Sequence, residues 1–160
     1  MPDYTILIID YEPASIEKLR ALLEKVGYRV ETAADGITGT ERFNTLEPVM
    51  AFIEELLPRK TGLDTCRELK ATPLGARTPI VVLGSRFRGK RDRAAALGHY
   101  GGDAYLTKPV TTDDVAALVE RFVIPRPAPA PEAPSEDLET ELDDHLDSLL
   151  GGLSTEKPSS

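Results

Sequence analysis

The sequence is poor in cysteine, histidine and tryptophan, and the shortages of cysteine and histidine argue against disulfide-bonded and transition-metal proteins. Of its 160 residues, one is cysteine, two are histidine and none is tryptophan. Cys66 cannot form an internal disulfide, and its place in a helical pattern predicts a small packing residue. His99 and His145 have no cysteine or histidine companions, so we expect no transition-metal site.

Long apolar runs are also missing. No run approaches the roughly 18 apolar residues that a membrane-spanning helix needs, and no charged-then-apolar leader opens the chain. We therefore expect a cytoplasmic protein that makes no membrane contact.

Acidic charge is concentrated at one end. Residues 1–124 carry 18 acidic and 17 basic side chains, whereas residues 125–160 carry 9 acidic and 2 basic ones. Such a tail repels phosphate backbones and anionic lipid, so we expect no nucleic acid or membrane partner. A basic protein surface is the better expectation.

Strand-like apolar runs alternate with helical patterns along residues 1–124. The strand patterns cover residues 4–9, 28–33, 49–53, 80–83 and 104–106, and the helical patterns cover 13–26, 37–46, 63–71, 89–97 and 112–122. This alternation predicts an α/β domain with a parallel sheet and helices on both faces. Asp10, Glu54, Gly84 and Lys108 follow the ends of separate strands, where ligands bind in such sheets, so we expect them in one crevice.

The composition changes after this domain. Residues 125–134 form a Pro/Ala-rich linker, residues 135–153 an acidic amphipathic helix, and residues 154–160 a tail expected to be disordered. The helix carries a stripe of leucines, namely Leu138, Leu142, Leu146, Leu149 and Leu150. An amphipathic helix this short is marginal alone, so we expect it to bind a partner or to mediate oligomerisation.

Three segments, 6–13, 49–62 and 105–109, together resemble the receiver domain of bacterial two-component response regulators. The resemblance covers about residues 3–124. It implies a doubly wound, flavodoxin-like sheet of five parallel strands in the order 2-1-3-4-5. It also implies transfer of a phosphoryl group from a histidine kinase to an aspartate beside Mg²⁺.

The sequence departs from the family pattern at the chemical groups. Asp10 and Lys108 match it, but Glu54 replaces the phosphate-accepting aspartate and Tyr11 replaces the second carboxylate of the acidic pair. Glu54 is one methylene too long for in-line transfer and can instead reach Lys108. Glu12 follows the acidic pair and is not the usual metal ligand.

The hydroxyl that contacts the phosphoryl group is also replaced. Gly84 has no side chain, and Ser85 would supply a hydroxyl only if the loop shifted register. Tyr105 matches the switch aromatic of the family, but we expect it to lack its partner.

These departures favour a pseudo-receiver that is not an enzyme, has no catalytic residue and needs no cofactor or metal. Its altered pocket comprises Asp10, Tyr11, Glu12, Glu54, Gly84, Ser85 and Lys108. One alternative is a working receiver phosphorylated on Glu54, or less plausibly on Glu55, with Mg²⁺ held around Asp10, Glu12 and Lys108. Another is a small-molecule binder, which predicts a deep apolar pocket beside the strand ends, whereas a pseudo-receiver predicts a crevice filled by Tyr11 and Glu54.

A cluster of cations precedes and opens the 89–97 helix: Arg86, Arg88, Lys90, Arg91 and Arg93. A charge run is most often a solvated surface, but this one could bind an acidic helix of this chain or of a partner. In the family the surface of the 89–97 helix, the 104–106 strand and the 112–122 helix binds partners. We therefore expect signalling or regulatory proteins as partners, and a homodimer through that surface is possible.

Overall fold

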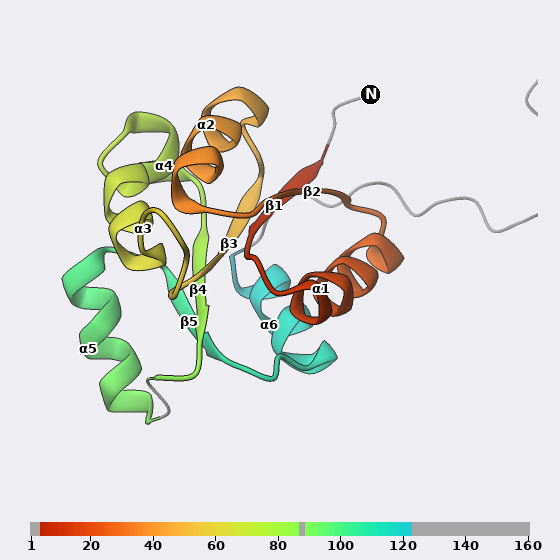
Figure 1. Cartoon of the computed structure of the whole chain (residues 1–160). Coiled ribbons are helices and arrows are strands. Elements are labelled where there is room, and N and C mark those ends of the chain that lie inside the picture. Colours follow the sequence, from red (N-terminus) through yellow and green to blue (C-terminus); the bar gives the residue numbers. More distant parts are fainter. Residues whose placement is uncertain (1–3, 87–88, 123–160) are drawn as a thin grey trace, which may run out of the picture. The chain divides into compact units, whose positions relative to one another are not determined.

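The computed structural model describes residues 4–86 and 89–122, which form a five-stranded parallel sheet between two layers of helices (Figure 1). The strands are β1 Thr5–Ile9, β2 Arg29–Ala33, β3 Met50–Glu54, β4 Ile80–Gly84 and β5 Ala104–Thr107. The helices are α1 Pro13–Val26, α2 Gly36–Leu46, α3 Gly62–Lys70, α4 Pro73–Arg77, α5 Lys90–Tyr100 and α6 Thr112–Arg121. The strand order is β2-β1-β3-β4-β5, which confirms the prediction.

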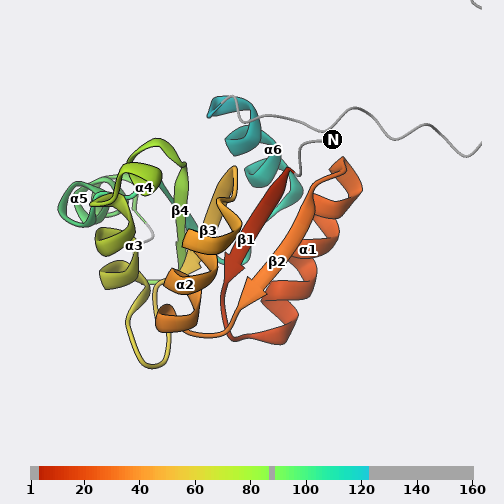
Figure 2. The same ribbon diagram turned by 90° about the horizontal axis from the view of Figure 1, so that it is seen from above.

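Alternate residues of the strands supply two separate cores. Ile6 and Ile8 of β1 pack in the layer of α1 and α6, whereas Leu7 and Ile9 pack against the opposite layer. Figure 2 shows α1 and α6 on one side of the sheet and α2, α3, α4 and α5 on the other. This arrangement follows from the two-residue period of a strand, since both faces of every central strand are buried.

Local signals set the ends of most elements. Pro13 occupies the first turn of α1, and Gly27 ends that helix with a left-handed φ of 112°. Helix α5 continues past the predicted end at residue 97 to Tyr100, and Gly101 ends it with a φ of 82°. The short helix α4 was not predicted, because five residues carry too little apolar periodicity to be seen.

Part of the predicted organisation lies outside the described residues. This holds for the linker, the acidic helix with Leu138, Leu142, Leu146, Leu149 and Leu150, the terminal tail, and Arg88. Within residues 4–86 and 89–122, none of the helices has both the length and the apolar character that crossing a bilayer requires.

Candidate functional site

The carboxyl ends of the parallel strands bring the four predicted residues to one edge of the sheet. Asp10 follows β1, Glu54 and Gly84 are the last residues of β3 and β4, and Lys108 follows β5. The register pairs Glu54 with Leu83 and Gly84 with Thr107, so neighbouring strands end at nearly the same level. The crevice expected from the sequence is therefore present.

Lys108 lies at the centre of this crevice and pairs with three carboxylates. Its Nζ lies 3.0 Å from Asp10 Oδ2 and 3.4 Å from Glu12 Oε1, and it also pairs with Glu54 Oε1. Burial disfavours the ammonium charge, but the hydrogen bonds and charges of Glu54 and Asp10 outweigh burial and raise the pKa of Lys108. Lys108 is therefore a firmly held cation.

Asp10 is fully buried and both of its oxygens accept hydrogen bonds. Oδ1 accepts from the backbone N–H groups of Tyr11 at 2.7 Å and Glu12 at 3.0 Å. Oδ2 accepts from the Ser15 hydroxyl and from Lys108 Nζ, both at 3.0 Å. A buried carboxylate with four donors has its charge well compensated, which makes Asp10 a structural anchor for the loop after β1.

Tyr11 does not fill the crevice, and this part of the prediction was wrong. Its side chain is exposed, at 52 % of its surface, while Glu54 is 7 % exposed. The space beside Lys108 is occupied by the carboxylates of Glu54 and Glu12. A phenol hydroxyl needs a hydrogen-bond partner, and at the surface water provides one.

Glu54 is held from both sides. Oε1 pairs with Lys108, and Oε2 accepts a hydrogen bond of 3.0 Å from the backbone N–H of Leu56. The expectation that the longer side chain reaches the lysine directly agrees with this geometry. Both carboxylate oxygens of Glu54 are therefore already engaged.

Tyr105 has a partner that the sequence argument missed. Its hydroxyl donates a hydrogen bond of 2.8 Å to Glu55 Oε2, and the phenol is 6 % exposed. Glu55 is 1 % exposed and lies against Gly84, where a side chain is absent. The hydroxyl-bearing partner that the family has at position 84 is absent, since Gly84 has no side chain, and Glu55 accepts the hydrogen bond of Tyr105 instead.

Strand alternation is the signal that could have revealed this contact. Phe52 packs in the same core as Ile6 and Ile8, whereas Ile53 and Tyr105 pack in the opposite core. Consecutive residues point to opposite faces, so Glu54 and Glu55 must serve different sides of the sheet, with Glu55 on the side of Tyr105.

Comparison with known proteins decides the family. Residues 6–120 match the response regulator receiver domain family. The chain belongs to that family. Response regulator MprA of Mycobacterium sp. (strain KMS) is 35 % identical over 142 residues, which cover 89 % of this chain and 59 % of that protein. The chain thus spans less than two thirds of this curated relative.

Solved receiver domains have the same fold. The signal receiver domain of a signal transduction histidine kinase from Syntrophus aciditrophicus is 29 % identical, with a TM-score of 0.65 over 81 % of this chain and 98 % of that one. The receiver domain of the sensor histidine kinase PA1611 from Pseudomonas aeruginosa PAO1 is 26 % identical, with a TM-score of 0.66 over 76 % and 98 %. That structure has a magnesium ion coordinated in its active-site cleft.

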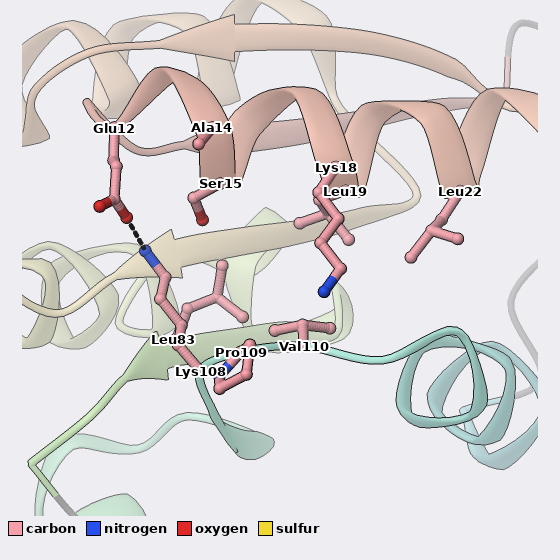
Figure 3. A pocket seen from close by; sticks show the side chains of 10 residues that line it. All are labelled: Glu12, Ala14, Ser15, Lys18, Leu19, Leu22, Leu83, Lys108, Pro109 and Val110. Carbon is pink, nitrogen blue, oxygen red and sulfur yellow. Dashed lines mark hydrogen bonds and ion pairs between the residues drawn. The ribbon is translucent and has the colours of Figure 1, made fainter.

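A pocket of about 340 Å³ opens beside the crevice of this receiver domain. It lies between α1 and the segment Lys108–Val110, with Leu19 and Leu22 on its apolar wall and Glu12 and Lys108 paired at one end (Figure 3). The Lys18 side chain points across it from α1, as Figure 3 shows. The pocket is mostly apolar and adjoins the strand ends.

The cationic cluster of the receiver domain lies at the entry to α5. Arg86, Lys90 and Arg91 are exposed, and Arg93 is partly exposed. Lys90 and Arg91 stand in the first turn of α5, where the helix dipole disfavours cations by about 0.3–1 kcal/mol each. These charges therefore do not stabilise the helix that carries them.

Cys66 fits the predicted packing role. It is fully buried, and burial raises the pKa of its thiol to about 12, which leaves it protonated and unreactive at neutral pH. Among residues 4–86 and 89–122, no group of three histidine, cysteine, aspartate or glutamate side chains is arranged to hold a metal ion.

Proposed function

We propose that this receiver domain accepts no phosphoryl group and acts as a non-catalytic signalling module through contacts with other proteins. The observation that carries the proposal is the ion pair between Glu54 and Lys108. A lysine that neutralises a transferred phosphoryl group has to exchange its carboxylate partners for the phosphoryl oxygens. Lys108 is instead held by Glu54 and Asp10, so a fixed carboxylate stands in for the transient charge of an acyl phosphate.

The oxygen donors of the crevice do not fit Mg²⁺, which supports a module without a cofactor. Mg²⁺ needs near-octahedral oxygen coordination, usually with one or two carboxylates, and the three carboxylates of this crevice, the exposed Glu12 included, are all paired with Lys108. Both oxygens of Asp10 already accept hydrogen bonds, and Tyr11 offers an exposed phenol in place of the second carboxylate. The ammonium of Lys108 lies among the carboxylates, where it neutralises them in place of a divalent cation.

The main alternative is a receiver that is phosphorylated on Glu54, with Asp10, Glu12 and Lys108 around Mg²⁺. Incubation of the full chain with Mg²⁺ and acetyl phosphate separates the two hypotheses. We expect the intact mass to stay unchanged, because Glu54 is engaged and one methylene too long. An aspartate-containing receiver domain in the same reaction serves as the control and must gain the adduct. A phosphoryl adduct mapped to Glu54 or Glu55 would refute the proposal.

A second candidate function is binding of a small molecule, and the 340 Å³ pocket between α1 and Lys108–Val110 favours it. An apolar wall with Lys18 at its rim suits a compact ligand that has an apolar body and an anionic group. In NMR titrations such a ligand would shift the signals of Leu22 and Val110, whereas phosphorylation would shift those around Glu54.

We propose that the cationic cluster Arg86, Arg88, Lys90, Arg91 and Arg93 is a partner-binding surface. The unfavourable placement of Lys90 and Arg91 in the first turn of α5 supports this role, since folding alone does not favour cations there. An acidic segment of a signalling protein is the complementary partner. The leucine stripe of residues 138–150 is proposed as a second binding element, and the surface of α5, β5 and α6 as a homodimer contact.

Charge reversal tests the cationic cluster. One variant combines four substitutions in the cluster: Arg86→Glu, Lys90→Glu, Arg91→Glu and Arg93→Glu. The control variant carries four substitutions elsewhere: Lys18→Glu, Lys25→Glu, Arg67→Glu and Arg77→Glu. Both variants change the net charge equally. We expect only the first to lose partners in a pull-down, and sedimentation of the same samples reports any homodimer. Equal losses in both variants would mean that net charge, and not this surface, attracts the partner.

A further inference from the structure

Glu55 is a buried carboxylate whose hydrogen bonds reach the connection after β4 and strand β5. Its Oε2 accepts hydrogen bonds from the backbone N–H groups of Ser85 at 3.1 Å and Arg86 at 3.2 Å, and from the Tyr105 hydroxyl at 2.8 Å. The residue is 1 % exposed. Burying a carboxylate is unfavourable unless donors compensate its charge, and here three donors converge on Oε2, whereas the buried Oε1 has no hydrogen-bond partner among the described residues.

The absence of a side chain at Gly84 makes room for this carboxylate. A Cβ atom built on Gly84 would overlap the Glu55 carboxylate and lie 2.5 Å from Tyr105 Oη. The last residue of β4 can therefore be only glycine while Glu55 keeps this position. Glu55 and Gly84 together occupy the volume that a hydroxyl-bearing residue of β4 would fill.

The contacts of Glu55 join parts of the domain that are far apart in sequence. Glu55 directly follows β3, Ser85 and Arg86 begin the connection from β4 to α5, and Tyr105 belongs to β5. The cationic cluster starts at Arg86, one of the two residues whose backbone N–H is held. The carboxylate thus acts on both the switch aromatic and the start of the proposed partner-binding surface.

We propose that Glu55 is a built-in anionic ligand that holds Tyr105 in its buried rotamer and fixes the start of the β4–α5 connection in one conformation. Glu55 is a positioning residue, since it acts through Tyr105 and two backbone N–H groups. The structural part of this inference stands by itself. Its consequence, a partner-binding surface with one constant state, rests on the proposed function of a receiver that signals without phosphorylation.

A double-mutant cycle in the full chain tests the inference, with Gly84→Ala, Glu55→Ala and the combined variant. We expect Gly84→Ala alone to lower the Tm by about 10 °C, because the new methyl group overlaps the carboxylate. In the Glu55→Ala background the same substitution should lower the Tm by no more than about 2 °C, because the carboxylate is gone and the Tyr105 hydroxyl, no longer bonded to it, can turn away from the methyl group. If the Gly84→Ala variant does not fold, a combined variant that does fold would equally show that Glu55→Ala relieves the overlap.

Amide hydrogen exchange gives a readout that general destabilisation would not produce. In Glu55→Ala we expect the Ser85 and Arg86 amides to exchange about tenfold faster than in the wild type, after correction by amides of β1 as the internal reference. Glu55→Gln keeps the shape of the side chain and should show a smaller increase. Equal Tm losses for Gly84→Ala in both backgrounds, or unchanged Ser85 and Arg86 exchange in Glu55→Ala, would overturn the proposal.

These measurements need no phosphodonor. Their outcome is therefore independent of the acetyl phosphate experiment, and the two proposals can be refuted separately. A phosphoryl adduct on Glu54, together with a smaller Tm loss for Gly84→Ala in the Glu55→Ala background, would refute the proposed function and leave the role of Glu55 intact. An unchanged intact mass, together with equal Tm losses for Gly84→Ala in both backgrounds, would refute the role of Glu55 and leave the proposed function intact.

Discussion

Lys108→Met is expected to lower the free energy of unfolding by about 3 kcal/mol at neutral pH, the lower end of the range for breaking a buried ion pair. The variant leaves Asp10, which is fully buried, and Glu54, which is nearly so, without their shared cation. Urea unfolding measures the change. Lys18→Met is the matched control, since Lys18 is an exposed lysine in the same pocket and is expected to change stability by less than about 0.5 kcal/mol.

The pKa of Lys108 gives this prediction a pH dependence. Because the folded-state pKa is raised, the stabilisation by Lys108 is fully present below the unfolded-state pKa of lysine, about 10.4, and is lost as the pH rises through the folded-state pKa. The difference between wild type and Lys108→Met should therefore be constant from about pH 7 to 9 and shrink above that range. A difference below about 1 kcal/mol at pH 7 would show that the ion pairs do not organise the crevice.

Gly62→Ala is expected to destabilise the domain by about 3 kcal/mol or more, the upper end for overpacking. A Cβ atom at Gly62 would overlap the carbonyl oxygen of Glu54 and lie 2.7 Å from Glu55 Cα. These are backbone atoms at the end of β3, which cannot move without displacing both acidic side chains. The Gly62 N–H also donates a hydrogen bond of 2.9 Å to the Glu55 carbonyl.

Gly98→Ala provides the opposite control. Gly98 lies inside α5 and a Cβ atom there meets nothing within 4 Å. Since alanine favours a helix over glycine by about 0.8–1 kcal/mol, we expect a modest gain in stability. Thermal unfolding of the Gly62→Ala and Gly98→Ala variants measures both changes in stability. A Gly62→Ala variant as stable as the wild type would mean that the chain after β3 is free to shift.

The sheet and the crevice could be predicted because both follow from simple periodicity. Buried runs such as Ile6–Ile9 indicate strands, and alternation with helices forces a parallel sheet whose carboxyl ends share one edge. Asp10, Glu54 and Lys108, which span 98 positions of sequence, could therefore be placed in one crevice without knowledge of side-chain rotamers.

The finer features of the site depend on side-chain direction, which periodicity does not give. Tyr11 follows a buried residue but turns to solvent, because carboxylates already surround Lys108. Glu55 turns to the opposite face from Glu54, and its contact with Tyr105 requires the gap at Gly84. In the sequence, Gly84 stands out as the loss of a hydroxyl. In the structure, the missing side chain leaves the space that the Glu55 carboxylate occupies.

Under the proposed function, the position of Glu55 beside Gly84 links the substitutions that would be needed to give this domain phosphoryl chemistry. A threonine at position 84 would overlap the Glu55 carboxylate where it now lies, so it requires Glu55 to turn away or to be shortened. An aspartate at position 54 would lie on the other face of the sheet, and alone it would leave Tyr105 hydrogen-bonded to Glu55. Substitutions at positions 55 and 84 are therefore coupled to each other, whereas a substitution at position 54 is independent of both.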